Sequence, residues 1–266
     1  MSKLFSKVCT LTIGDRQLSY PPIDIEFDSK LAISQPPSTE VKLYNPNEDT
    51  ISTVAKIVNG YGPTVSIDAG FEEWHGECVN GYVTAYSVKK EHTDKILTFQ
   101  VTDSGNKFEK IINKTYLNQN ADVILKDMIS AVGVKNDSIT IGTNKFYKTF
   151  TAKMFSDALA TILKDTASIS YYQNGFMTIQ PKTLTTKQKY GYSLSLNSGL
   201  INVPEKALIN GVDGIKFQTL YLFNLYAGSI FKIDSRTAQG LYQIQTGTKK
   251  FSSFGKAECE FYAVPV

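Results

Sequence analysis

The chain has 266 residues, enough to bury a full core in one large domain or in two to three small ones. With 42% hydrophobic and 20% charged residues, its composition excludes a disordered chain, and a formal net charge of +3 is too small to indicate nucleic-acid binding by itself. The 15 tyrosines and 15 phenylalanines favour half-buried sheet surfaces and interfaces.

Residues 1–105 are predicted to form a β-rich unit. Apolar and polar residues alternate along 8–13, 23–28 and 38–45, and three further strands follow residue 62. A period of two is typical of half-buried strands. Six or so strands with one short helix are enough for a small closed barrel.

The short helix is expected within 46–62. Asn47 or Asp49 can cap its start, and Gly60 can end it. Its apolar residues share one helical face. These residues are Ile51, Val54, Ile57 and Val58.

Residues 106–190 change character and are predicted to form a helix-plus-hairpin module. One amphipathic helix is expected between a cap at Asn120 and a stop at Gly133, and a second over 154–167. The Asn174-Gly175 pair then predicts a tight hairpin, because a type I′ turn needs positive φ at both positions. The polar, basic segment 182–191 is expected to be a linker.

Alternation returns over 191–266 and predicts a second β-rich unit. The heptapeptide 62–68, GPTVSID, resembles the heptapeptide 228–234, GSIFKID. Each copy is followed by a turn, an alternating strand, a basic turn and a last alternating strand. We therefore expect two related β domains around the module.

The stretch 71–83, FEEWHGECVNGYV, concentrates residues that could carry chemistry. His75 and Cys78 have a spacing that could supply two zinc ligands, but the only other histidine is His92. Reading 70–76 as a polar turn and the residues from Glu77 onward as a returning strand needs no metal. The sequence therefore predicts no metal site here and a core position for Cys78.

Other catalytic classes find no support in the sequence. Glu72 and Glu73 are adjacent in a polar turn, with nothing to desolvate either one as glycoside hydrolysis requires. There is no Gly-x-Ser-x-Gly elbow, P-loop or Gly-x-Gly-x-x-Gly. We expect no enzyme and no cofactor. Five lysines are interpreted as solvated turn residues: Lys182, Lys187, Lys189, Lys249 and Lys250.

The three cysteines indicate no disulfide framework. Cys9, Cys78 and Cys259 are far apart and odd in number, which suits a reducing site of synthesis. No apolar run approaches the roughly 20 residues of a membrane span. The N-terminus meets polar residues too soon for a signal peptide, so we expect synthesis in the cytoplasm without export by that route.

The segment 41–88 resembles the N-terminal region of tail hub proteins of phages and related contractile injection machines. That family typically has a strand ending in Tyr-Asn or Asn-Leu, a capped short helix, an apolar strand, an Ala-Gly-Tyr/Phe turn and a strand with apolar residues before a glycine. The matching positions are Leu43, Tyr44, Asn45, Thr50, Ile51, Val65, Ile67, Ala69, Gly70, Phe71, Val79, Gly81 and Val83.

Later segments resemble the same family in the same order. The family's helix and Asn-Gly hairpin match 157–181, its Gly-Leu-Ile segment matches 198–205, and its final strand series matches the region from residue 220. The proline often present in that last series is replaced by Phe223-Asn224-Leu225.

The resemblance implies two tail-tube-like β-barrels, over 1–105 and 191–266, flanking the module of 106–190. It also implies a homo-trimer whose six barrels sit under the tail tube and hold the central spike, next to the tape-measure protein. Duplicated barrels would give a three-fold ring approximate six-fold symmetry. The location would be the virion tail or baseplate, assembled in the host cytoplasm, with nucleic acid only passing through the lumen and no membrane insertion.

Three alternatives stay open from the sequence. One is a hexameric distal tail or tube-terminator protein, and another is a glycan-binding β module with Trp74 and Tyr61 as a sugar platform. The third is a cell-wall hydrolase that would use Glu73 or Glu77. Under the leading interpretation Trp74, Tyr61 and Phe71 are the candidate interface residues.

Overall fold

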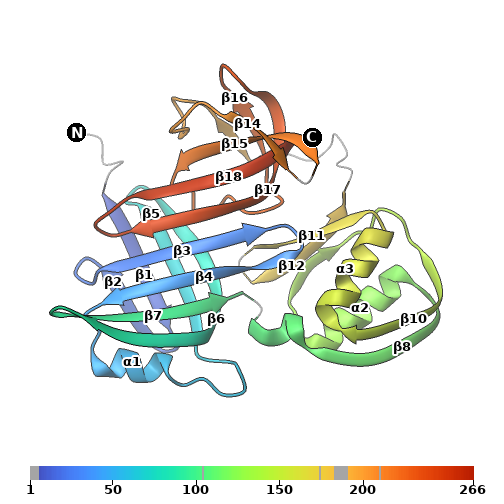
Figure 1. Cartoon of the computed structure of the whole chain (residues 1–266), viewed down its shortest axis with the longest axis horizontal. Coiled ribbons are helices and arrows are strands. Elements are labelled where there is room, and N and C mark those ends of the chain that lie inside the picture. Colours follow the sequence, from blue (N-terminus) through green and yellow to red (C-terminus); the bar gives the residue numbers. More distant parts are fainter. Residues whose placement is uncertain (1–5, 104, 174, 183–190, 210) are drawn as a thin grey trace.

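The computed structural model describes residues 6–103, 105–173, 175–182, 191–209 and 211–266. It is mainly β, with three α-helices, and its elements form an N-terminal half, a helical module and a C-terminal half (Figure 1). The α+β, mainly β fold class expected from the sequence is confirmed, and the closure of each half into a barrel stays a prediction. None of the helices in these ranges is long and apolar enough to cross a membrane.

The N-terminal half contains seven strands and one helix. Asn47 begins the helix as predicted, because its side chain accepts a hydrogen bond from the Thr50 amide at 2.8 Å. The elements are β1 (Lys7–Ile13), β2 (Arg16–Tyr20), β3 (Ile25–Ala32), β4 (Gln35–Tyr44), α1 (Glu48–Val54), β5 (Thr64–Phe71), β6 (Trp74–Glu91) and β7 (Asp94–Thr102).

Two boundaries in this half differ from the prediction. Helix α1 ends at Val54 and does not reach Gly60. Asn59 and Gly60 instead take positive φ in a separate turn that pairs Val58 with Tyr61. The polar turn expected over 70–76 is shorter than predicted. Pairing between β5 and β6 continues to the last residue of β5, so the turn is left with Glu72 and Glu73.

The helical module packs two helices against its own strands. Both predicted helices are present, and Gly133 ends the first in the left-handed conformation that a stop glycine supplies. The elements are η2 (Gly105–Glu109), β8 (Ile111–Asn120), α2 (Ala121–Val132), β9 (Asn136–Ile139), β10 (Phe146–Met154), α3 (Phe155–Asp165), β11 (Ser168–Gln173) and β12 (Phe176–Pro181).

The hairpin predicted within the module is confirmed by the antiparallel pairing of β11 and β12. Gly175 has φ +82°, whereas Asn174 lies outside the described residues. Residues 183–190 of the expected linker also lie outside the described residues. Strands β8 and β10 were not predicted, because only a few of their residues are buried and the apolar alternation is weak.

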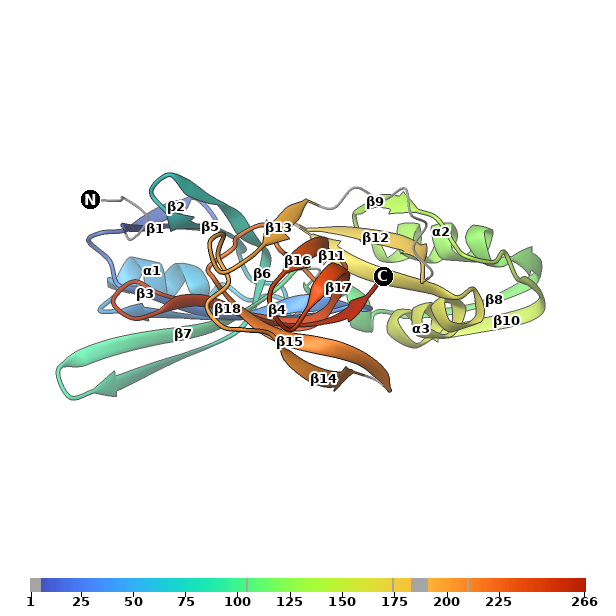
Figure 2. The same ribbon diagram turned by 90° about the horizontal axis from the view of Figure 1, so that it is seen from above.

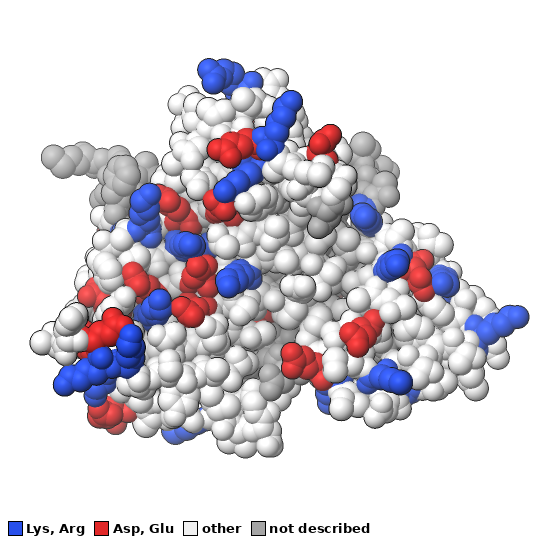
Figure 3. Space-filling model, viewed as in Figure 1, with Lys and Arg blue, Asp and Glu red and all other residues white. Residues whose placement is uncertain are grey.

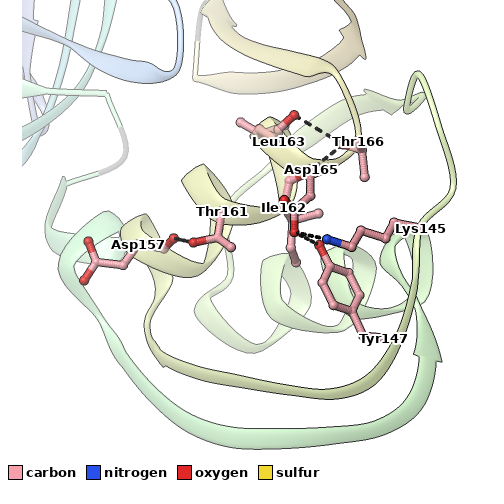
Figure 4. Close-up of polar contacts among 8 residues, drawn as sticks. All are labelled: Lys145, Tyr147, Asp157, Thr161, Ile162, Leu163, Asp165 and Thr166. Atoms are coloured by element: carbon pink, nitrogen blue, oxygen red, sulfur yellow. Dashed lines mark hydrogen bonds and ion pairs between the residues drawn. The ribbon is translucent and has the colours of Figure 1, made fainter.

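Two surface clamps fasten the helices of the module to its strands. In one, Asp165 at the end of α3 accepts hydrogen bonds from Lys145 and Tyr147, each at 2.8 Å (Figure 4). In the other, Asp127 of α2 accepts from Lys114 at 2.7 Å and Tyr116 at 2.6 Å. Each clamp places its lysine over the ring of its tyrosine, with Nζ 5.1 Å from the ring centroid of Tyr116 and 5.0 Å from that of Tyr147.

The C-terminal half joins the N-terminal half in one 13-stranded sheet. Its strands are β13 (Tyr192–Leu194), β14 (Glu205–Ile209), β15 (Val212–Leu220), β16 (Ile230–Asp234), β17 (Gln239–Ser252) and β18 (Ala257–Pro265). β17 pairs with β3, so the hydrogen-bonded path β14-β15-β18-β17 continues into β3-β4-β7-β6-β5-β1-β2.

The predicted repeat is confirmed by the strand pairing. β5 begins at Thr64 and β16 at Ile230, so each of these strands starts at the third residue of its heptapeptide. The order β3-β4-β7-β6-β5 in one half matches β14-β15-β18-β17-β16 in the other. The halves differ at the next strand, where β1 runs antiparallel to β5 but β13 runs parallel to β16.

Burial separates the chain into two cores. One cluster takes its buried residues from 108–179 and belongs to the module. The other combines residues from 9–101 with residues from 194–263, so both halves share it. In Figures 1 and 2 the module lies at one end of the long axis, beside the sheet. Domain boundaries at 105/106 and 190/191 stay a prediction.

Candidate assembly interface

The stretch 71–83 forms the end of β5, a short turn and the start of β6. Glu72 and Glu73 are exposed in the turn, and Cys78 is buried in the core. His75 Nδ1 lies 2.5 Å from an Asp68 carboxylate oxygen, so its partner is a neighbouring strand residue. Within the described ranges, no group of three or more His, Cys, Asp or Glu side chains is placed to hold a metal ion.

Trp74 connects the two halves of the sheet. Its ring centroid lies 5.8 Å from that of Phe223 and 6.2 Å from that of Tyr192, both of which belong to the C-terminal half. Gly76 makes room for this contact, because a Cβ atom there would lie 2.5 Å from the Phe223 ring. Trp74 is still 37% exposed, so part of its surface is free to meet another molecule.

The two other candidate interface residues lie in different surroundings. Phe71 is 6% exposed and packs in the shared core, because the last residue of β5 faces inward. Tyr61 is half-buried and meets Tyr82 edge-on, with ring centroids 6.0 Å apart. The interface roles of Trp74, Tyr61 and Phe71 stay predictions.

The sheet also forms a buried cluster that sequence reasoning missed. Cys78 and Cys259, expected to be remote, lie close enough to interact electrostatically with each other and with Lys249. Burial raises the pKa of Cys78 to about 12 and that of Cys259 to about 11. Because the thiolate is the reactive form of cysteine, these protonated thiols are poor nucleophiles at neutral pH.

Lys249 corrects the interpretation of that lysine as a solvated turn residue. It is fully buried, donates a hydrogen bond to the Phe223 carbonyl at 2.7 Å and lies 3.8 Å from the Tyr226 ring centroid. Burial lowers its pKa to about 8. Lys249 alternates with Gly247 and Phe251 on the inward face of β17, and this period of two was the sequence signal that could have predicted its burial. Lys187 and Lys189 lie outside the described residues.

Charges on the outer face of the sheet alternate in sign. Figure 3 shows acidic and basic side chains intermingled over the region of β3, β4, β17 and β18. Ion pairs there include Lys250 with Asp28 at 3.6 Å and Lys216 with Glu260 at 3.1 Å. Such a face lacks the single-signed groove by which proteins follow a nucleic-acid backbone.

Apolar side chains are exposed on two projecting hairpins. Figure 2 shows the β6–β7 and β14–β15 hairpins extending away from the body of the molecule. Tyr86 and Val88 of β6 are 44% and 45% exposed, and Leu208 of β14 is 74% exposed. Exposed apolar residues on strand edges are typical of surfaces that pair with another chain.

Comparison with known proteins gives a match at the level of structure alone. No protein-family model and no curated protein sequence matches the chain. The 43 kDa tail protein of prophage MuSo2 from Shewanella oneidensis superposes with a TM-score of 0.72 at 10% identity, covering 98% of this chain and 97% of that one. The chain has the fold of phage tail proteins.

Two further structures extend this match. A tail protein from Neisseria meningitidis MC58 also gives a TM-score of 0.72, at 6% identity over 97% of this chain and 96% of that one. The E. coli c3393 protein, a type VI secretion component described as similar to T4 tail proteins gp27 and gp5, gives 0.72 at 12% identity. This match covers 96% of this chain and 76% of c3393.

Proposed function

We propose that this tail-type chain is a structural, non-enzymatic hub of a phage tail or baseplate. The supporting observation is the fold match over 96–98% of the chain to tail and secretion-system proteins, together with the duplicated half-sheet. In this proposal three copies form a ring that presents six similar half-sheets. The ring joins a six-fold tail tube to a three-fold central spike.

The proposed partners follow from that position. One face of the ring contacts the tail tube protein, the other holds the spike, and the tape-measure protein ends nearby. Nucleic acid only passes through the lumen. The outer face of the sheet carries charges of both signs, so it offers no separate binding site for a polyanion. Assembly takes place in the host cytoplasm, and the mature location is the virion tail.

Native mass spectrometry of the purified chain tests the stoichiometry. The expected species is a trimer with three times the mass of the 29.5 kDa chain. A hexamer would instead favour a distal tail or tube-terminator protein. A chain that stays monomeric at every concentration, and neither assembles with its tube protein nor enters tail particles, would contradict the hub proposal.

A further inference from the structure

The repeat fixes which residues of the two halves are equivalent. A β-bulge interrupts the pairing of β6 with β7 between Val83 and Ala85, and another interrupts that of β17 with β18 between Ile244 and Thr246. Val83 therefore corresponds to Ile244, and Ala85 to Thr246. With this correspondence the C-terminal part of β6 is equivalent to the C-terminal part of β17.

Residues of β3 and β14 are matched by starting just after each bulge and stepping from each residue to the residue paired with it on the next strand. In each half the path crosses three successive pairings and ends on β3 or on β14, so Asp28 corresponds to Glu205. The path is Ala85, Gln100, Glu40 and Asp28 in the N-terminal half, and Thr246, Tyr262, Lys216 and Glu205 in the C-terminal half.

One junction between half-sheets is present within the chain. After its bulge β17 pairs antiparallel with β3, from Thr246 opposite Ala32 to Ser252 opposite Glu26. Phe251 stacks on Phe27 with ring centroids 5.3 Å apart, and Lys250 forms an ion pair with Asp28. This junction buries the inward side chains of both strands.

The opposite edge of each half, formed by β6 in the N-terminal half and by β14 in the C-terminal half, has no further neighbouring strand among the described residues. In the described residues, β6 after its bulge pairs only with β7, and β14 pairs only with β15. Every residue of β6 from 85 to 91 is exposed, whereas every second residue of β17 from 247 to 251 is buried. The difference comes from the neighbouring strand that β17 has and β6 lacks.

The exposed apolar residues lie where a second junction would bury them. Tyr86 and Val88 are opposite Phe99 and Leu97, so they share the face that points to the core. Leu208 corresponds to Leu31. Leu31 lies in the internal junction and is 4% exposed, whereas Leu208 has no neighbouring strand on its outer side and is 74% exposed. A neighbouring strand at each edge would remove these side chains from water.

We infer that β14 of one copy pairs antiparallel with β6 of the next copy, in the register of the internal β3–β17 junction. Lys89 of one copy then lies opposite Glu205 of its neighbour, which repeats the charges of the Lys250–Asp28 pair. Ser87 lies opposite Ala207, and Tyr86 opposite Leu208. The contact is head-to-tail, and with the three-fold rotation of the proposed hub it closes into a ring. This inference rests on the proposed ring-forming function and adds the contact that builds the ring.

Cysteine cross-linking tests the register directly. Directly opposite residues on paired strands have Cβ atoms about 4.5–5.5 Å apart, close to the reach of a disulfide, and residues two positions away are about 7–8 Å apart. We expect the double variant Ser87→Cys/Ala207→Cys to form covalent dimers and trimers under mild oxidation. A slipped control, Ser87→Cys/Glu205→Cys, is expected to link at least tenfold less.

Single variants and the wild type complete the experiment. Because the contact is head-to-tail, Ser87→Cys and Ala207→Cys alone should give no covalent dimer, and the three native cysteines are buried. A native trimer without the Ser87–Ala207 cross-link would overturn this inference and leave the hub proposal intact. Preferential linking of the slipped pair, or dimers from one single variant, would also overturn it. A monomer that links in no variant would overturn this inference, and it would contradict the hub proposal as well if it neither assembles with the tube protein nor enters tail particles.

Discussion

The helical module and the sheet bury their apolar residues in different ways. The module closes its core with one continuous segment, whose buried residues run from Phe108 to Ile179. The sheet needs segments from opposite ends of the chain, since Phe27 of β3 stacks on Phe251 of β17 and both meet Tyr221. The module is therefore a local unit, whereas the two halves depend on each other for one core.

Removing one buried ring from each core should give the largest effects and separate the two regions. Phe251 is 1% exposed and Phe155 is fully buried against Phe108, at a centroid distance of 5.2 Å. Phe251→Ala and Phe155→Ala should each lower the free energy of unfolding by about 3–5 kcal/mol. Hydrogen exchange measured by mass spectrometry checks where the structure loosens.

The location of faster exchange decides whether the comparison holds. We expect Phe251→Ala to accelerate exchange in β3 and β4 as well as in β17 and β18, and Phe155→Ala to act on α2 and α3 first. If the Phe155 variant loosens the sheet as much as the module, the module is not a separate local unit.

A second difference is that only the sheet core buries an amine among the described residues. The folded chain releases the proton of Lys249 at a pKa of about 8, but an unfolded chain holds it until about 10.5. Between these values the unfolded state binds more protons, so this group makes stability rise with pH, by about 3 kcal/mol in total. The buried thiols and tyrosines have raised pKa values and give the opposite slope.

Comparison with Lys249→Met isolates the lysine from those groups. Chemical denaturation of both proteins between pH 7 and pH 10.5 should show the wild type gaining stability relative to the variant as pH rises. A pH-independent difference between the two proteins would mean that Lys249 is solvated and would remove the second distinction between the cores.

The contact between the module and the sheet should make the free energy of unfolding depend on pH in the acid range. Asp103 follows β7 and accepts a hydrogen bond from the Gly175 amide of the module at 3.1 Å, and burial raises the pKa of Asp103 to about 7. Between about pH 4 and 7 the unfolded state loses a proton that the folded state keeps. Stability should therefore fall as pH rises, by on the order of 2 kcal/mol in total for this partly exposed group.

Asp103→Asn should flatten that dependence, because an amide does not titrate and its oxygen can still accept from Gly175. Urea denaturation of the wild type and the variant at half-unit pH steps gives the measurement. The nearby charged groups are Glu77, Lys107 and Lys135, which both proteins retain. Parallel stability curves for the two proteins would show that burial at this contact does not keep the Asp103 carboxyl protonated.

Local patterns explain which parts of the fold were predictable. The helices α2 and α3, the α1 cap at Asn47 and the β11–β12 hairpin each depend on neighbours within a few residues, and each was found. Strands β8 and β10 were missed because their burial comes from helices packed on one side only. The β3–β17 junction joins residues from opposite ends of the chain, which no local pattern encodes.

The candidate interface was predictable only in part. Trp74 was identified by its residue type, but its contact with Phe223 depends on the C-terminal half folding over β6. Phe71 has the same aromatic character and is buried, because its position on β5 decides which way it points. The exposed edge at Tyr86 and Leu208 became visible only when the strand register of both halves was known.

The surface clamps of the module should give the smallest effect. Hydrogen bonds from Lys145 and Tyr147 hold the pKa of Asp165 below its usual value, and the pKa of Asp127 is held low in the same way by Lys114 and Tyr116. Asp165→Asn should lower the free energy of unfolding by less than about 1 kcal/mol at neutral pH.

The pH dependence of that small loss distinguishes a clamp from a general charge effect. A carboxylate with a depressed pKa stabilises the fold above its unfolded pKa, near 3.8, and this contribution is lost as pH falls through the folded value. The deficit of Asp165→Asn should therefore shrink below about pH 4, whereas Asp137→Asn, an exposed control on β9, should stay within about 0.5 kcal/mol of wild type throughout. Equal deficits at all pH values would assign the loss to the helix end and not to the ionised clamp, and the module would then be held by its core alone.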